Sequence, residues 1–155
     1  MPAMQPPIIG KMERVGTKHL ICTVGLPYSG KSSWARNTSW PIVCPDAIRL
    51  SIHGQRFLQE AEPMVWMMAK YMVASLFFAG HDHVILDSTC TTPWRRAEWE
   101  SKHWDTYWKL FKASAEECCR RAELAGDQDI VPIIVMQSQV ISFPVSKIWG
   151  TSSAI

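Results

Sequence analysis

Short apolar runs alternate along this chain with longer segments whose apolar residues recur every three or four positions. The short runs predict strands, and the longer segments predict helices. The strands are expected at residues 19–24, 41–45, 83–87 and 107–111. The helices are expected from about 31 to 37, at 46–53, 62–79, 93–102 and 114–125, and from 130 onward. Strands that alternate with helices predict an α/β fold, in which a parallel sheet carries helices on both faces.

The segment 62–79 gives the longest expected helix. Pro63 suits its first turn, and Gly80 suits its end. Apolar residues lie on both sides of this helix, Trp66 and Phe77 among them. This pattern predicts that other elements cover much of the helix surface.

Residues 25–32 match the phosphate-binding pattern G-x-x-x-x-G-K-[ST] between a predicted strand and a predicted helix. Gly25 and Gly30 let the backbone wrap closely, so that amide N–H groups and the helix N-terminus face phosphate oxygens. Lys31 is expected against the terminal phosphates, and Ser32 as a ligand of Mg²⁺. A chance match in a glycine-serine turn is disfavoured by the strand and helix around it. The residues expected to bind ATP are Gly25, Leu26, Pro27, Tyr28, Ser29, Gly30, Lys31, Ser32 and Ser33.

Two aspartates follow predicted strands at the sheet edge where ligands of α/β proteins gather. Asp87 ends the strand at 83–87 and is expected to hold Mg²⁺ or to organise the acceptor; the alternative is a carboxylate that caps a loop. Asp46 is able to accept a proton from an attacking hydroxyl, with Arg49 one helical turn later to contact a substrate phosphate. The alternative for Asp46 is a helix N-cap, and the two roles are compatible.

Paired arginines occur at two places. Arg95 and Arg96 begin the helix expected at 93–102 and are candidates for binding an anionic acceptor; the alternative is solvated surface charge. Arg120 and Arg121 are candidates for a lid that stabilises transferring charge, whereas their position late in a helix also suits the helix dipole. Trp94 is a weaker candidate for stacking on a base.

Composition limits the remaining possibilities. A chain of 155 residues fits one domain, and we expect a loose leader at 1–17, the domain at 18–140 and a tail of uncertain structure at 141–155. The formal net charge of +2 does not by itself indicate a nucleic-acid partner.

No apolar run reaches the length of about 18 residues needed to span a bilayer, so we expect no membrane association. The 5 cysteines lack C-x-x-C spacing, and the first residues lack signal-peptide features, which favours the cytoplasm.

Three segments in order resemble the kinase domain of bacteriophage-type polynucleotide 5′-hydroxyl kinases. They are Gly-Leu-Pro-Tyr-Ser-Gly-Lys-Ser-Ser-Trp-Ala-Arg at 25–36, Asp-Ala-Ile-Arg at 46–49, and Leu-Asp-Ser-Thr at 86–89 followed by Pro-Trp-Arg-Arg-Ala-Glu-Trp at 93–99. The resemblance covers about residues 18–132 and implies a P-loop kinase fold. It further implies that Lys31 and Ser32 bind ATP–Mg²⁺, that Asp46 is the general base, that Arg49 contacts the acceptor, and that Asp87 organises the metal or acceptor site. Lid arginines are implied at Arg120 and Arg121.

The expected function is therefore ATP-dependent transfer of the γ-phosphoryl group to a hydroxyl of a nucleic acid, at a 5′-hydroxyl end. One alternative is a kinase for a different hydroxyl, either on a hydroxymethylated base in DNA or on a small alcohol. Another is an NTP-binding module that is not a kinase. The two alternative acceptors remain open because residues 122–146 contain no lysine or arginine and the net charge is small.

Overall fold

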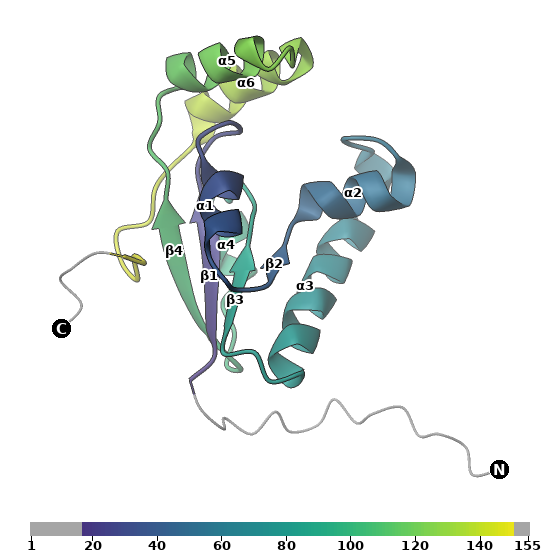
Figure 1. The fold of residues 1–155 in the computed structure, drawn as a ribbon, viewed down its shortest axis with the longest axis vertical. Helices are drawn as coiled ribbons and strands as arrows, with labels where there is room; N and C mark the ends of the chain where they lie inside the picture. The colour runs from purple at the N-terminus through teal and green to yellow at the C-terminus, as the bar shows by residue number, and fades with distance from the viewer. Residues whose placement is uncertain (1–16, 151–155) are drawn as a thin grey trace.

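The computed structural model describes residues 17–150 and contains a parallel sheet of four strands. The sheet order is β2-β3-β1-β4, so the first strand lies between the third and the fourth. In this register, Ile21 is paired with Ile85 on one side and Tyr107 on the other. The strands are β1 (His19–Val24), β2 (Ile42–Val43), β3 (His83–Leu86) and β4 (Asp105–Leu110). The predicted α/β fold with a parallel sheet is confirmed (Figure 1).

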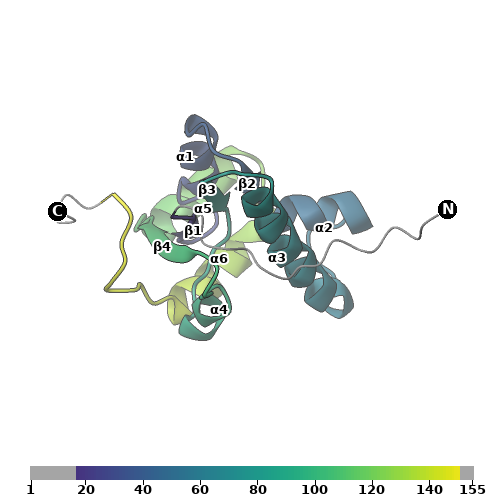
Figure 2. The ribbon, with the colours of Figure 1, turned by 90° about the horizontal axis from the view of Figure 1, so that it is seen from below.

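The helices lie around this sheet on both faces, as predicted. In the view from below, α1 and α4 are on opposite sides of the strands (Figure 2). α5 and α6 pack together beyond the carboxyl ends of the strands (Figure 1). The helices are α1 (Lys31–Asn37), α2 (Pro45–His53), α3 (Glu62–Phe78), α4 (Pro93–Ala97), α5 (Ala115–Leu124) and α6 (Val131–Val140), with short 3₁₀ turns at η1 (Gln59–Ala61) and η2 (Gln128–Ile130).

Two boundaries differ from the prediction for one reason. α4 ends at Ala97 instead of reaching residue 102, and β4 begins at Asp105, two residues early. Between them the chain turns inward, and Trp99 is completely buried. Its carbonyl accepts hydrogen bonds from Trp104 Nε1 and Thr106 Oγ1. Burial of this large indole decides where the helix stops, and a local pattern of helical spacing does not contain that information.

The main core lies between the sheet and one stripe of α3. Val65, Ala69, Val73 and Phe77 recur every four residues along the helix and are buried against alternate residues of β1, such as Leu20. A spacing of four residues keeps side chains on one helix face, and alternate strand residues share one sheet face. This packing fixes α3 beside the sheet edge that carries β2.

The prediction that α3 is largely covered is wrong. Met64, Met67, Tyr71 and Phe78 have exposed fractions of 60%, 65%, 62% and 70%. The sheet and α2 contact only part of the helix circumference, so the apolar residues outside the buried stripe face solvent. Apolar content on all sides of a helix therefore did not indicate burial on all sides here.

Most of the predicted leader, and residues 151–155 of the predicted tail, lie outside the described residues. The described part of the tail returns to the sheet at Ile148, which forms a parallel bridge with Trp108 of β4. Trp149 N donates to the Trp108 carbonyl over 2.9 Å. No helix between residues 17 and 150 is both long enough and apolar enough to cross a bilayer.

Candidate active site

The loop between β1 and α1 has the backbone that its glycines predict. Gly30 precedes α1 with a φ of 102°, a value in the left-handed region that glycine adopts without strain. A Cβ on Gly25 would lie only 2.7 Å from the carbonyl oxygen of Phe111, so no larger side chain fits there. Within the loop, the buried Ser29 Oγ has no hydrogen-bond partner. An unpartnered buried hydroxyl in a loop of this shape fits the binding of a phosphate group.

Lys31 lies inside this loop and is only 8% exposed. Its ammonium donates a hydrogen bond to the Leu26 carbonyl over 2.6 Å. Burial lowers the pKa of Lys31, whereas the negative charges of Asp87 and Asp46 act in the opposite direction. The buried ammonium is thus held at the loop backbone, where the terminal phosphates were predicted to bind.

Ser32 and Asp87 meet directly. Ser32 Oγ donates a hydrogen bond to Asp87 Oδ2 over 2.7 Å, and Asp87 is 8% exposed. A hydroxyl and a carboxylate are the oxygen ligands that Mg²⁺ prefers. No group of three or more His, Cys, Asp and Glu among residues 17–150 is arranged to hold a metal ion alone. The donor set thus fits an ion that arrives with phosphate oxygens as its other ligands.

A pocket of about 500 Å³ opens beside the loop, a size typical of small-ligand sites. Its lining brings together part of the predicted loop and one predicted lid arginine with a residue that was not predicted, Arg36 in the last turn of α1. The lining residues are Tyr28, Gly30, Lys31, Ser32, Ser33, Arg36 and Arg121. Among the other predicted loop residues, Gly25, Leu26 and Ser29 are buried and form the frame of the loop.

The two predicted lid arginines have different positions. Arg121 lines the pocket, and it donates to the Tyr28 carbonyl over 3.1 Å and to Glu117 Oε1 over 2.9 Å. Arg120 is 59% exposed and forms a two-bond ion pair with Glu117, outside the pocket lining. The hydrogen bonds from Arg120 and Arg121 lower the pKa of Glu117 to about 2. Arg121 alone of the two is placed to reach a bound phosphate.

A cluster around Asp127 closes one side of the loop, and sequence reasoning missed it. Asp127 Oδ2 accepts a hydrogen bond from the Tyr28 hydroxyl over 2.9 Å. The guanidinium of Arg56, which follows α2, makes two further bonds to Asp127, of 3.0 and 2.7 Å. Together they lower the pKa of Asp127, with Arg56 as the main cause. This cluster connects the loop, the segment after α2 and the segment after α5.

Asp46 and Arg49 lie together on α2, as their spacing predicts. Asp46 is 75% exposed, and its Oδ1 accepts a hydrogen bond from Arg49 over 2.6 Å. The N-cap position of α2 is occupied by Cys44, so Asp46 does not have the capping role considered above. Arg49 also makes two bonds to Glu62 at the start of α3, of 2.7 and 2.8 Å. Glu62 was not predicted, because nothing in the local sequence marks it as the partner of a residue on another helix.

The two arginines on α4 also lie in different environments. Arg96 is 8% exposed and donates to the carbonyls of Cys90 and Ser142 and to Ser142 Oγ. The structure therefore gives Arg96 a structural role, and we do not keep it as an acceptor-binding residue. Arg95 instead lies between Trp66 and Trp94.

Comparisons with known proteins agree with this geometry. The model of the family described as AAA domain matches residues 20–130, which is more than half of the chain. A solved structure of the Pnkp1/Rnl/Hen1 complex contains a chain that is 26% identical, with a TM-score of 0.62 over 72% of this chain and 41% of that chain. The present chain therefore spans about two fifths of the length of that relative.

Two further solved structures share the fold over most of their length. A gluconokinase from Sinorhizobium meliloti 1021 is 17% identical, with a TM-score of 0.59 over 83% of this chain and 78% of that one. The Mycobacterium tuberculosis APS kinase CysC, solved in complex with AMPPNP and APS, is 13% identical, with a TM-score of 0.58 over 84% and 86%. These likenesses concern the fold.

Proposed function

The chain belongs to this AAA domain family and is a P-loop phosphotransferase, and from that premise we propose that it transfers the γ-phosphoryl group of ATP to a 5′-hydroxyl end of a nucleic acid. The observation that carries the proposal is the contact between Ser32 and Asp87 beside the loop lysine. Ser32 Oγ donates to Asp87 Oδ2 over 2.7 Å, directly after Lys31 at the start of α1. A lysine for the phosphates and a hydroxyl–carboxylate pair for a metal ion, with Asp46 on α2 as the proposed proton acceptor, support phosphoryl transfer.

In the proposed reaction, Asp46 accepts the proton of the attacking hydroxyl. Its exposure of 75% leaves it open to an acceptor, and Arg49 beside it carries a charge for an acceptor phosphate. Lys31 and Arg121, which both line the pocket, stabilise the negative charge on the transferring group. When bound through Ser32 and Asp87, Mg²⁺ neutralises phosphate charge.

The choice of a nucleic acid as the acceptor is supported by the similarity to one solved complex. The 26% identical chain comes from the Pnkp1/Rnl/Hen1 complex, which is an RNA repair complex. A small alcohol is the competing acceptor. It is favoured because residues 122–140, which include α6, contain no lysine or arginine. A lid that holds a polyanion would be expected to be basic.

The proposal is tested with γ-labelled ATP and four acceptors. The acceptors are a strand with a free 5′-hydroxyl, the same strand with a blocked end, a blocked strand that carries hydroxymethylated bases, and gluconate as the small alcohol. Label on the first strand alone supports the proposal. Label on the third or fourth acceptor instead, or on none, overturns it.

The variants Lys31→Ala and Asp46→Asn identify the roles of the two groups. Lys31→Ala should abolish transfer and weaken ATP binding. Asp46→Asn should lower kcat by about 10²–10⁴-fold, the usual contribution of a general base, and leave ATP binding unchanged. Asp82→Asn is the matched control, because Asp82 is an exposed aspartate that pairs with Lys18 just before β3, outside the nucleotide pocket. A module without an acceptor would tolerate Asp46→Asn.

A further inference from the structure

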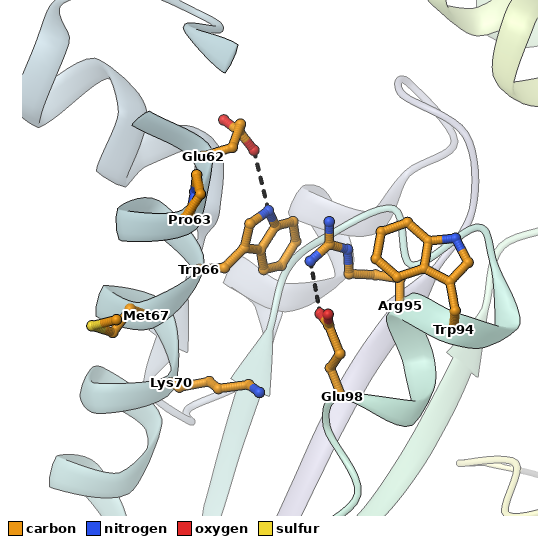
Figure 3. A pocket seen from close by; sticks show the side chains of 8 residues that line it. All are labelled: Glu62, Pro63, Trp66, Met67, Lys70, Trp94, Arg95 and Glu98. Atoms are coloured by element: carbon orange, nitrogen blue, oxygen red, sulfur yellow. Dashed lines mark hydrogen bonds and ion pairs between the residues drawn. The ribbon is translucent and has the colours of Figure 1, made fainter. Parts of the chain in front are cut away.

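A second groove, of about 480 Å³, lies between α3 and α4, and its residues do not line the nucleotide pocket (Figure 3). Trp66 and Lys70 extend into it from α3. Trp94 and Arg95 of α4, and Glu98 directly after α4, line the other wall, with Arg95 between Trp66 and Trp94. The two walls thus bring together indole rings and charged groups from segments far apart in the chain.

In this groove, the guanidinium of Arg95 lies between two indole rings before any ligand binds. The guanidinium carbon of Arg95 lies 4.0 Å from the centroid of the Trp66 ring and 4.5 Å from that of Trp94. Glu98 holds this guanidinium through a bond of 2.7 Å. Trp94 remains 60% exposed, so much of its indole surface is open to solvent. A fixed and exposed indole is a surface on which a flat aromatic ligand stacks.

The unpaired charge in this groove is positive. Glu62 is already bound by Arg49 and by Trp66 Nε1, and Glu98 is bound by Arg95. Lys70 lies near the ring of Trp99, with its ammonium 5.8 Å from the centroid, and it has no carboxylate partner among residues 17–150. A lysine without a carboxylate partner, in the same groove as the exposed indole of Trp94, suits a ligand that combines a phosphate with an aromatic ring.

The groove begins at the proposed acceptor site. Glu62 joins the two, because it binds Arg49, the partner of Asp46, and also binds Trp66 within the groove. Trp66 and Lys70 follow Glu62 along α3 by four and eight residues, which corresponds to about 6 and 12 Å of helix. A small alcohol held at Asp46 would not extend that far, whereas the continuation of a nucleic-acid strand would.

We infer that this groove binds the nucleotide that follows the reactive end of a single-stranded acceptor, with its base stacked on Trp94 and a backbone phosphate beside Lys70. The inference deepens the proposed function and rests on it. A paired base is stacked within its duplex and does not offer a free face, so the groove selects single strands over duplexes.

The first test compares a short single strand that has a free 5′-hydroxyl with the same strand lacking the base of its second nucleotide. With the wild-type protein, loss of that base should raise the KM for the strand about tenfold, and leave kcat and the KM for ATP unchanged. Trp94→Ala should raise the KM for the intact strand by about the same factor and should not affect the abasic strand. Trp94→Phe should restore most of the affinity. Phe78→Ala is the control, because Phe78 is 70% exposed at the far end of α3.

Lys70→Ala gives an independent readout. It should reduce the slope of log KM against log salt concentration by about 0.7, the value for one phosphate contact of a single strand. Lys147→Ala, which removes an exposed lysine outside the groove, should leave that slope unchanged. Equal KM values for the intact and abasic strands, or an unchanged KM in Trp94→Ala, would overturn the inference.

Binding of a 5′-phosphorylated strand, followed by fluorescence anisotropy without ATP, separates this inference from the proposed reaction. If no strand is phosphorylated but Trp94→Ala weakens binding about tenfold, the groove is supported and the proposed reaction fails. If strands are phosphorylated but Trp94→Ala binds as well as the wild type, the reaction stands and the groove assignment fails. Transfer to a small alcohol without any binding of the strand rejects both.

Discussion

Ser32 Oγ donates a hydrogen bond to Asp87 Oδ2 over 2.7 Å, although the two residues are 55 positions apart in the chain. The contact forms because β1 and β3 are parallel neighbours, so that their carboxyl ends, and the residues that follow them, meet at one sheet edge. It places a hydroxyl and a carboxylate side by side at the mouth of the phosphate loop.

This pair predicts how the proposed activity depends on Mg²⁺. Asp87→Asn keeps the side-chain shape but removes the negative charge, so the concentration of MgCl₂ that gives half-maximal transfer should rise by about 10- to 100-fold. Rates measured over a magnesium titration check this. Asp82→Asn serves as control, since Asp82 lies at the opposite end of β3. An unchanged magnesium requirement in Asp87→Asn would exclude Asp87 from the metal site.

The Asp127 cluster predicts a change in nucleotide release. Arg56→Ala removes the two bonds that connect the segment after α2 to Asp127. Because Arg56 is 49% exposed, the effect should be modest, and we expect the dissociation rate of a fluorescent ATP analogue to rise by about two- to fivefold. Stopped-flow displacement measures this rate. Lys147→Ala breaks a comparably exposed contact to Glu100 elsewhere and should release the analogue at the wild-type rate.

The Arg49–Glu62 pair predicts a pH-dependent contribution to stability. Hydrogen bonds from Arg49 lower the pKa of Glu62 below its ordinary value of 4.5. In the pH range between the lowered and the ordinary pKa, the unfolded chain binds more protons than the folded protein, so the pair stabilises the fold above about pH 4.5 and this contribution is lost as the pH falls.

Glu62→Gln should therefore have a lower free energy of unfolding than the wild type at about pH 7, and this difference should shrink towards about pH 3. Urea titrations over that range measure it. A difference that stays constant with pH would show that the charge of Glu62 does not contribute.

Arg95 and Arg96 should respond differently to the same substitution. Arg96→Met leaves the buried carbonyl of Cys90 and the partly buried carbonyl of Ser142 without their donor, so the free energy of unfolding should fall by about 1.5–3 kcal/mol. Arg95→Met removes an ion pair with Glu98 near the surface and should cost about 1 kcal/mol or less. Equilibrium unfolding of the two variants provides the comparison. Equal losses, or a purely catalytic defect in Arg96→Met, would contradict the structural role of Arg96.

The residues that sequence reasoning placed correctly are those whose position follows from the chain direction of the sheet. The pattern around Gly25 and Lys31 predicts a loop after a strand, and Asp87 follows another strand. Parallel pairing then brings them together without further information. Arg49 shares a helix with Asp46, and their contact follows from helical spacing alone.

The roles of several charged side chains were not determined by the sequence, because they depend on contacts between separate segments of the chain. Arg95 and Arg96 are adjacent and chemically identical, yet Arg96 is buried and donates to Ser142, 46 positions later, whereas Arg95 pairs with Glu98. Glu62 and Arg56 have their roles only because α2 and α3 pack together and the segment after α5 reaches the phosphate loop. The sequence by itself therefore determined the sheet, the phosphate loop and the position of Asp87 beside it, since these follow from local period and strand direction. Only the tertiary structure decided which charged side chains face the site and which support the fold, because that choice depends on which surfaces of separate helices meet.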